Sequence, residues 1–193
     1  MTQNEKAPQL PAMDPDTSEA TQKQLDLAIA QGDAYGAALE YMTGTVAHGG
    51  GQTEAGHYLI GYAVEEAEGM YMFTDGELEW TNPTEENVHI EVAVRDRADG
   101  RFVPAVKVFV TVIAPDGTEI GTEEQPLLWH PMIYHYGRNW TVPADGAYTL
   151  KVRVEPPTFM RHDETNGLRF TRVEEVVFEN VTIERGQEVV DVE

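Results

Sequence analysis

The sequence contains no cysteine among its 193 residues. Disulfides, thiolate metal sites, iron–sulfur clusters and cysteine nucleophiles are therefore excluded. Serine occurs once, at Ser18, so a serine nucleophile is excluded as well. No apolar run reaches the roughly 18 residues that a membrane-spanning helix needs, and no membrane insertion is expected.

Basic residues are also scarce. Thirteen Lys and Arg stand against 34 Asp and Glu, which gives a formal net charge of -21. Nucleic acids and anionic membrane surfaces require a basic face, so neither is an expected partner. Only four of the basic residues are lysine. This acidic, lysine-poor composition favours a halophilic protein, in which salt screens the repulsion between carboxylates, over an acidic mesophilic one. The unfolding midpoint of a halophilic protein should rise with salt.

Familiar catalytic and nucleotide-binding motifs are missing. The sequence has no GxGxxG, GxxxxGK[ST], GxSxG or HExxH pattern. Residues 1–16 are polar and proline-rich and lack the apolar core of a signal peptide. This segment is predicted to be a mobile tail. Two interpretations are open on this evidence: a cytoplasmic protein, or one whose leader has been removed.

A helical lead is predicted over residues 17–51. Asp16, Thr17 or Ser18 can cap a helix, and apolar and small residues then recur at helical spacing up to Met42. Residues 31–33, Gln-Gly-Asp, are expected to divide it into two helices. The glycines at 49–51 are expected to form a flexible joint. The small residues in the stripe favour close packing of this lead on its own domain.

Residues 52–193 have the pattern of an all-β domain. Short apolar or alternating runs separated by Gly, Pro, Asn and Asp predict seven strands and no helix between them, which favours an antiparallel sandwich. These strands are expected at 57–64, 70–73, 77–80, 88–94, 106–113, 147–154 and 173–183.

The stretch 126–140 has an unusual mixture of aromatic residues and metal-binding side chains. His130, Met132 and His135 offer imidazole and thioether groups, and a thioether selects soft or borderline ions such as copper. His130 and His135 differ in parity, so they cannot share one face of a strand. Pro131 and Gly137 favour an irregular loop, which removes that constraint. The alternative is an aromatic-rich strand end in the core.

Two further segments could supply ligands. His89 and Glu91 share the face of strand 88–94 that lies opposite its valines, where they could hold one ion or line one pocket. His162 lies in a predicted loop after Glu155-Pro156-Pro157, and loops on a rigid sheet commonly carry function. A structural histidine–glutamate pair and a solvated loop histidine are the corresponding alternatives.

Four segments in order resemble a known family. They are Val-His-Ile-Glu-Val-Ala-Val at 88–94, His-Tyr-Gly at 135–137, Val-Glu-Pro-Pro at 154–157 and Arg-His-Asp-Glu-Thr at 161–165. The chain resembles, over about residues 57–185, the extracytoplasmic iron-transport proteins that accompany ferrous-iron permeases and bind copper and iron. The resemblance implies an immunoglobulin-like sandwich, a homodimer, a permease partner and an extracytoplasmic location.

The resemblance also implies a metal site built from His89, Glu91, His135 and His162. The family's methionine, seven residues before the His-Tyr-Gly histidine, corresponds to Leu128 here. His130 or Met132 is expected to replace it, with His130 preferred. Replacement of thioether by imidazole would move preference toward Fe(II) or Cu(II), with Zn(II) as a surrogate.

Three functions follow from these residues. The leading one is a non-catalytic carrier or receptor in iron or copper uptake. Its affinity for the ion should decrease as the pH drops and the histidines become protonated. A non-haem iron oxygenase would use two histidines and one carboxylate facing an open cavity. A protein- or glycan-binding sandwich module would leave the histidines incidental and more than about 8 Å apart.

Overall fold

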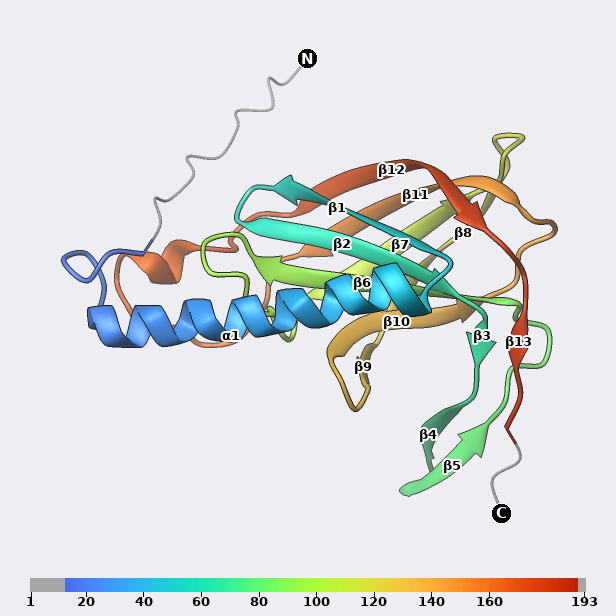
Figure 1. The fold of residues 1–193 in the computed structure, drawn as a ribbon, viewed down its shortest axis with the longest axis horizontal. Coiled ribbons are helices and arrows are strands. Elements are labelled where there is room, and N and C mark those ends of the chain that lie inside the picture. Colours follow the sequence, from blue (N-terminus) through green and yellow to red (C-terminus); the bar gives the residue numbers. More distant parts are fainter. Residues whose placement is uncertain (1–12, 191–193) are drawn as a thin grey trace.

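The computed structural model describes residues 13–190, which form two antiparallel sheets and one long helix (Figure 1). The first sheet contains, in order, β1 (Gly49–Ala55), β2 (Tyr58–Glu65), β6 (Val88–Asp96), β10 (Tyr134–Trp140) and β9 (Leu127–Trp129). The second contains β12 (Glu174–Ile183), β11 (Gly146–Glu155), β7 (Lys107–Ile113) and β8 (Glu119–Gln125). The predicted sandwich with an N-terminal helical extension is confirmed.

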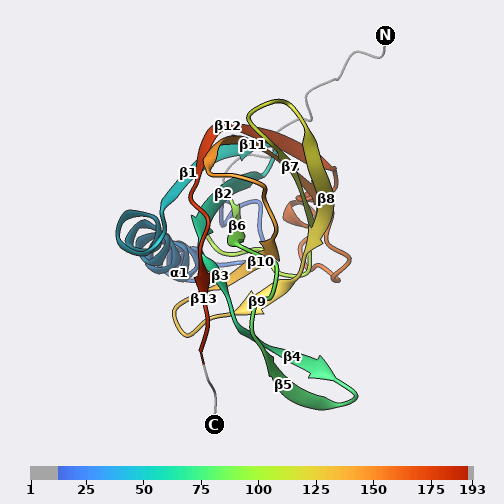
Figure 2. The same cartoon turned by 90° about the vertical axis from the view of Figure 1, so that its right-hand side faces the viewer.

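Two small ribbons and two short helical turns complete the described chain. The hairpin of β4 (Met70–Thr74) and β5 (Glu77–Thr81) projects from one end (Figure 2). Strand β3 (Ala67–Glu68) pairs in parallel with β13 (Gln187–Glu188). The π-helical turn η1 (Met42–Val46) follows the long helix, and the 3-10 turn η2 (Asn166–Leu168) precedes β12.

The core lies between the two sheets. Val88, Ile90, Val92 and Val94 face it from β6 and are fully buried, as the alternating pattern of the sequence predicts. The same alternation buries valines of β7 and β11 from the second sheet. All nine residues of β6 are buried, on both faces of the strand. The side chains on the outer face of β6 are therefore buried as well, although they include histidine and glutamate.

Helix α1 (Gln22–Tyr41) lies along the outside of the first sheet (Figures 1 and 2). It runs without the break predicted at residues 31–33. Gly32 faces the backbone of Asp99, and a Cβ at this position would lie 1.8 Å from the Asp99 carbonyl oxygen. This glycine therefore permits close packing of the helix rather than ending it. No helix in residues 13–190 is long and apolar enough to cross a membrane.

The start of α1 also differs from prediction. Thr21 is the N-cap, and the Gln24 side-chain oxygen accepts hydrogen bonds from the Thr21 amide and hydroxyl at 2.8 and 2.9 Å. This capping box fixes the start three residues after Ser18. The Ser18 hydroxyl instead donates to Asp163 Oδ2 at 2.9 Å, as does the Glu19 amide at 3.0 Å. The predicted tail at 1–16 lies mostly outside the described residues.

The predicted joint at 49–51 is the start of β1. Gly49, Gly50 and Gly51 pair with Val64, Ala63 and Tyr62 of β2, so the ladder orders their backbone. The seven predicted strands are present, each within two residues of its expected ends. The stretch 126–140 is a hairpin of β9 and β10, not an irregular loop, because residues 130–133 form a turn closed by the His130 amide and the Ile133 carbonyl.

Candidate metal centre

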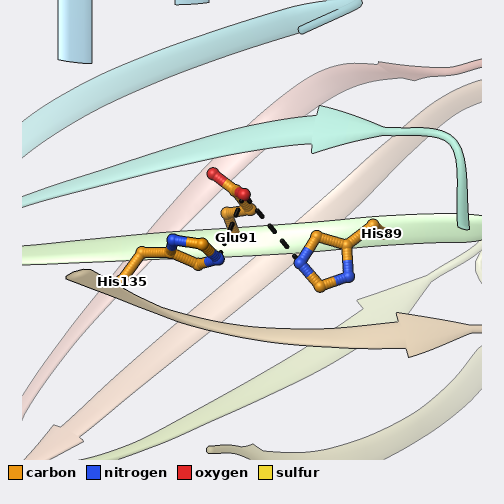
Figure 3. Close-up of side chains that lie close together, drawn as sticks. All are labelled: His89, Glu91 and His135. Carbon is orange, nitrogen blue, oxygen red and sulfur yellow. Dashed lines mark ion pairs between the residues drawn. The ribbon is translucent and has the colours of Figure 1, made fainter. Parts of the chain in front are cut away.

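Three side chains meet on the outer face of the first sheet. His89 and Glu91 come from β6, and His135 comes from the neighbouring strand β10 (Figure 3). Their exposed fractions are 0%, 4% and 3%. One ligand atom from each lies within 4.8 Å of the other two, and among the described residues they are the cluster of His, Asp and Glu side chains that could hold a metal ion. We call them the triad.

The separations within the triad suit one metal ion. Glu91 Oε1 lies 3.1 Å from His135 Nε2 and 3.9 Å from His89 Nε2. Two ligand atoms each about 2.1 Å from an ion are about 3.0 Å apart at right angles and about 4.2 Å apart when opposite. Both separations from Glu91 fall in this range, and all three ligand atoms lie within 4.8 Å of one another, so a modest adjustment of the side chains would place them around one ion.

The ring nitrogens of the triad lack hydrogen bonds. His89 Nε2 and both nitrogens of His135 are buried without a partner, since the 3.1 Å approach to Glu91 lacks hydrogen-bond geometry. An orphaned buried polar atom costs about 1–3 kcal/mol. Coordination of an ion would satisfy the two Nε2 atoms, so the donor set fits a metal of the type that prefers imidazole and carboxylate.

His89 is oriented by a neighbour on β10. Its Nδ1 lies 2.9 Å from Asn139 Oδ1, which accepts the Nδ1 hydrogen and leaves the Nε2 lone pair pointing at the other triad members. Asn139 Nδ2 donates to the Glu68 carbonyl at 2.7 Å, which fixes the direction of the amide. His89 is thereby held as a ready ligand.

Gly137 makes the space that the ligand nitrogen of His89 occupies. A Cβ at residue 137 would lie 2.7 Å from His89 Nε2 and 3.1 Å from Leu128 Cδ1. Any other residue would push the ring away from the site. The His-Tyr-Gly motif therefore requires glycine at this position for a steric reason. The same contact shows that Leu128, which corresponds to the family's methionine, lies beside the triad.

Burial determines the charge state of the triad. It lowers the pKa of His89 to about 4, against the opposing effect of the Asn139 hydrogen bond, and that of His135 to about 3. Burial, followed by the charges of Glu65 and Glu68, raises the pKa of Glu91 to about 9. Near pH 7 both imidazoles are therefore neutral and free to bind a metal, and Glu91 holds a proton that a cation would displace.

A cavity of about 220 Å³ adjoins the triad. It lies between the C-terminal half of α1 with η1 and the first sheet, and Glu91 and His135 line it. Arg95 lines it farther along β6, where its guanidinium donates to Gln52 Oε1 at 2.6 Å. An ion in the triad would have room for a further small ligand on this side.

The other predicted ligands are not brought to the triad within one chain. His130 is exposed in the β9–β10 turn, where its Nδ1 accepts the Met132 amide at 3.2 Å, and Met132 is 38% exposed. The His162 side chain is 97% exposed and lies 3.8 Å from Glu19 Oε2. Their positions depend on turns and loops, so the convergence of these three on the triad stays a prediction that a bound ion or a second chain would have to complete.

Sequence reasoning also missed two neighbours of His89. Asn139 is one, and Glu68 on β3 is the other, with its Oε1 3.7 Å from His89 Nε2. Burial, with smaller effects of Glu65 and Glu188, raises the pKa of Glu68 to about 7. In the sequence, Glu68 resembles any member of an acidic surface run, and only the path of β3 beside the first sheet distinguishes it.

The fold and the triad define a β-sandwich protein with a His–Glu–His group of the kind that binds transition-metal ions. The family described as Fe2+ transport protein matches residues 37–184, and the chain belongs to this family. The match begins inside α1, so most of that helix precedes it. No match is found among curated protein sequences.

Two solved structures are similar in fold. FetP from uropathogenic Escherichia coli strain F11 is 18% identical, with a TM-score of 0.56 over 69% of this chain and 95% of its own. The copper-reconstituted P19 protein from Campylobacter jejuni is 15% identical, with a TM-score of 0.59 over 72% of this chain and 96% of its own. Copper-bound variants of both proteins match as well. The predicted family is confirmed.

Proposed function

We propose that the protein binds an iron or copper ion as cargo through His89, Glu91 and His135 and hands it on in metal uptake. The observation that supports this most directly is the pair of buried Nε2 atoms with no hydrogen-bond partner. Family membership and the copper-bound structures of its relatives point the same way. In this function no bond of a substrate is made or broken, and the site serves to hold and release an ion.

Two imidazoles and a carboxylate favour borderline ions such as Fe(II) and Cu(II), with Zn(II) as a surrogate. Leu128 offers no thioether beside the triad, which removes the ligand that would favour Cu(I). The neutral state of both histidines allows binding at neutral pH without prior loss of a histidine proton.

A second copy of the chain would complete the site. His162 is exposed in its own chain, and in a homodimer it would approach the triad of the other copy. The edge of the first sheet beside the triad exposes Leu127, Trp129 and Tyr134 at 48%, 69% and 50%. An apolar edge of this kind suits an interface. An extracytoplasmic location and an iron permease as recipient belong to the same proposal.

Metal titration of the apo protein tests the function. Cu(II), and Fe(II) under anaerobic conditions, should bind at one site per chain in competition with a chelator of known affinity, and His135→Ala should remove this binding. His48→Ala, which removes an exposed histidine, serves as the control and should bind normally. Equal binding by wild type and His135→Ala would refute the proposal.

One observation favours a second candidate, the non-haem iron oxygenase. Its recipe is two histidines and one carboxylate with open positions facing a cavity, and the triad and its cavity satisfy it. Oxygen consumption by the Fe(II)-loaded protein with added 2-oxo acids would support the enzyme, and none would support the carrier. The binding-module alternative predicted separated histidines, whereas a ring nitrogen of His89 lies within 4.8 Å of one of His135.

A further inference from the structure

Glu68 lies close to the triad although no motif includes it. Its Oε1 is 3.7 Å from His89 Nε2, comparable with the 3.9 Å between the same nitrogen and Glu91. His89 is fully buried and this nitrogen has no hydrogen-bond partner. One orphaned ligand nitrogen is therefore approached by two carboxylates, one from β6 and one from β3.

The position of Glu68 is fixed by the same residue that orients His89. Asn139 Oδ1 accepts the Glu68 amide at 3.3 Å and its Nδ2 donates to the Glu68 carbonyl at 2.7 Å. The same Oδ1 contacts His89 Nδ1 at 2.9 Å. The side-chain amide of Asn139 thus fixes the backbone of Glu68 relative to the ring of His89. A residue whose only role was surface charge would need no such attachment.

The carboxylate of Glu68 is less enclosed than that of Glu91. Its side chain is 36% exposed, whereas that of Glu91 is 6% exposed. The distance of 3.7 Å already falls between the roughly 3.0 Å and 4.2 Å that separate two ligands of one ion. A small rotation of the side chain would therefore bring Glu68 onto an ion held by His89.

We propose that Glu68 is a further ligand, which converts the triad into a site of two imidazoles and two carboxylates. The inference rests on the proposed function and identifies the class of ion. Carboxylate oxygens suit harder ions, whereas thioether suits Cu(I). With Leu128 in place of the family's methionine and Glu68 nearby, the site selects Fe(II) and Mn(II) over Cu(I).

Glu65 provides a matched control. It pairs with His89 across β2 and β6 and is a half-buried carboxylate with an unpartnered Oε1. Burial raises its pKa from the ordinary value, as it does for Glu68. Glu65→Gln and Glu68→Gln thus remove the same charge from the same neighbourhood and keep side-chain size. Only the second removes the proposed ligand.

The test measures affinity for Mn(II), affinity for Cu(I), and the electron paramagnetic resonance spectrum of bound Cu(II). Glu68→Gln should weaken Mn(II) binding at least about tenfold, as expected when a ligand is lost, and should change Cu(I) affinity less than about threefold. It should also alter the Cu(II) hyperfine splitting, because an oxygen ligand is replaced. Glu65→Gln should leave that splitting unchanged.

Two outcomes would overturn the inference. Equal loss of Mn(II) affinity in both glutamine variants, with unchanged Cu(II) spectra, would show that Glu68 acts by charge alone. Normal Mn(II) binding by Glu68→Gln would show no role at all. In either case His135→Ala distinguishes failure of this inference from failure of the proposed function. Loss of metal binding in that variant would support the proposed function, and retained binding would refute it.

Discussion

The histidines near the predicted site fall into two regions that differ in how their positions are set. His89 and His135 lie in paired strands, where register and the alternation of side chains fix their direction, and both are buried. His130 and His162 lie in a turn and a loop and are exposed. The strand histidines are therefore oriented before any ion binds, whereas the orientation of the loop histidines can change when an ion or a partner binds.

Burial makes the first region the more informative one. Keeping His89 Nε2 and His135 Nε2 away from water without a partner costs free energy of folding. Exposed histidines carry no such cost, so their presence implies no function. A protein that retains a costly arrangement in its interior has a reason outside folding, and ion binding is the reason that these atoms fit.

The largest effect should come from the strand region itself. His89→Ala or His135→Ala should weaken Cu(II) binding at least about a hundredfold, because loss of a direct ligand exceeds the tenfold to hundredfold cost of losing an outer partner. Competition with a chromophoric chelator measures this. A loss below tenfold in both variants would remove the distinction between strand and loop histidines. Circular dichroism would establish that each variant is folded.

The pH dependence should follow Glu91 rather than the histidines. With the Glu91 pKa raised to about 9, a proton competes with the ion below that pH, and affinity should rise about tenfold per pH unit between pH 6 and 8. The histidine pKa values, about 4 and 3, lie below this window. The sequence alone predicts that affinity falls as histidine titrates, whereas burial moves both histidine pKa values below this window.

Glu91→Gln is the variant that checks this assignment. Its affinity should be lower than wild type at pH 8 but nearly flat from pH 6 to 8, since the amide binds no proton in this range. Chelator competition at each pH gives the slope. A steep slope that survives in Glu91→Gln would assign the proton to another group and would leave the pKa of Glu91 without a role in binding.

The folding stability of the metal-free protein should depend on pH through the same three side chains. Raising the Glu91 pKa from 4.5 favours its protonated form in the fold, so this contribution is lost as pH rises from 4.5 toward 9. Lowering the pKa of His89 and His135 from 6.5 favours their neutral forms, so that contribution is lost as pH falls below 6.5. Between pH 4.5 and 6.5 the two histidines outweigh the single glutamate, so the triad is least costly near pH 6.5.

Thermal melts of wild type and Glu91→Gln, with and without Zn(II), test this. The gap between the two apo proteins should widen in favour of the variant by several degrees from pH 5.5 to 8. Added Zn(II) should raise the wild-type midpoint more at pH 8 than at pH 5.5, because tighter binding stabilises more. A gap independent of pH would contradict the assigned protonation of Glu91.

Much of the sandwich could be predicted from the sequence. The valine alternation of β6 identified both its core face and the direction of His89 and Glu91, since period-two patterns translate directly into sheet faces. The strands that escaped prediction include β8 and β10, where Thr, Glu and Asn obscure the alternation. The glycines of β1 were taken for a joint, because a ladder partner far along the chain outweighs their local preference.

The site was predictable only in part, for a related reason. His89 and Glu91 followed from one strand, and His135 joined them through its motif. Glu68 and Asn139 depend on how β3 and β10 lie beside β6, which no local pattern encodes. His162 lies in an exposed loop, so its motif position does not by itself establish proximity to the triad within one chain, and its role as a ligand stays a prediction.

A smaller effect is expected from His162, and it should depend on association. In a homodimer His162→Ala should weaken Cu(II) binding about tenfold, as for a ligand supplied across an interface. At concentrations where the protein is monomeric, measured by ultracentrifugation, the same variant should bind as wild type does. Weakening that is equal in both states would mean that the loop closes on the triad of its own chain.

The smallest effect is expected in the β9–β10 turn. His130 is predicted from sequence to replace the family's methionine, ahead of Met132, yet its Nδ1 is occupied by the Met132 amide and its ring is exposed. It lies on the turn between the strand that carries His135 and β9, and it contributes after burial and His89 to the lowered pKa of His135. We therefore expect His130→Ala to weaken Cu(II) binding by no more than about threefold.

Met132→Leu should leave Cu(II) affinity unchanged, because it keeps the apolar volume and removes a sulfur that Cu(II) does not require. Calorimetry with Cu(II), and competition with a Cu(I)-specific chelator, distinguish the two residues. If His130→Ala weakened Cu(II) binding tenfold or more, the turn would supply a fourth ligand when the ion binds. The contrast between strand and loop histidines would then hold only for the metal-free protein. If Met132→Leu instead reduced Cu(I) affinity, the soft ligand missing at Leu128 would have moved four residues along the hairpin.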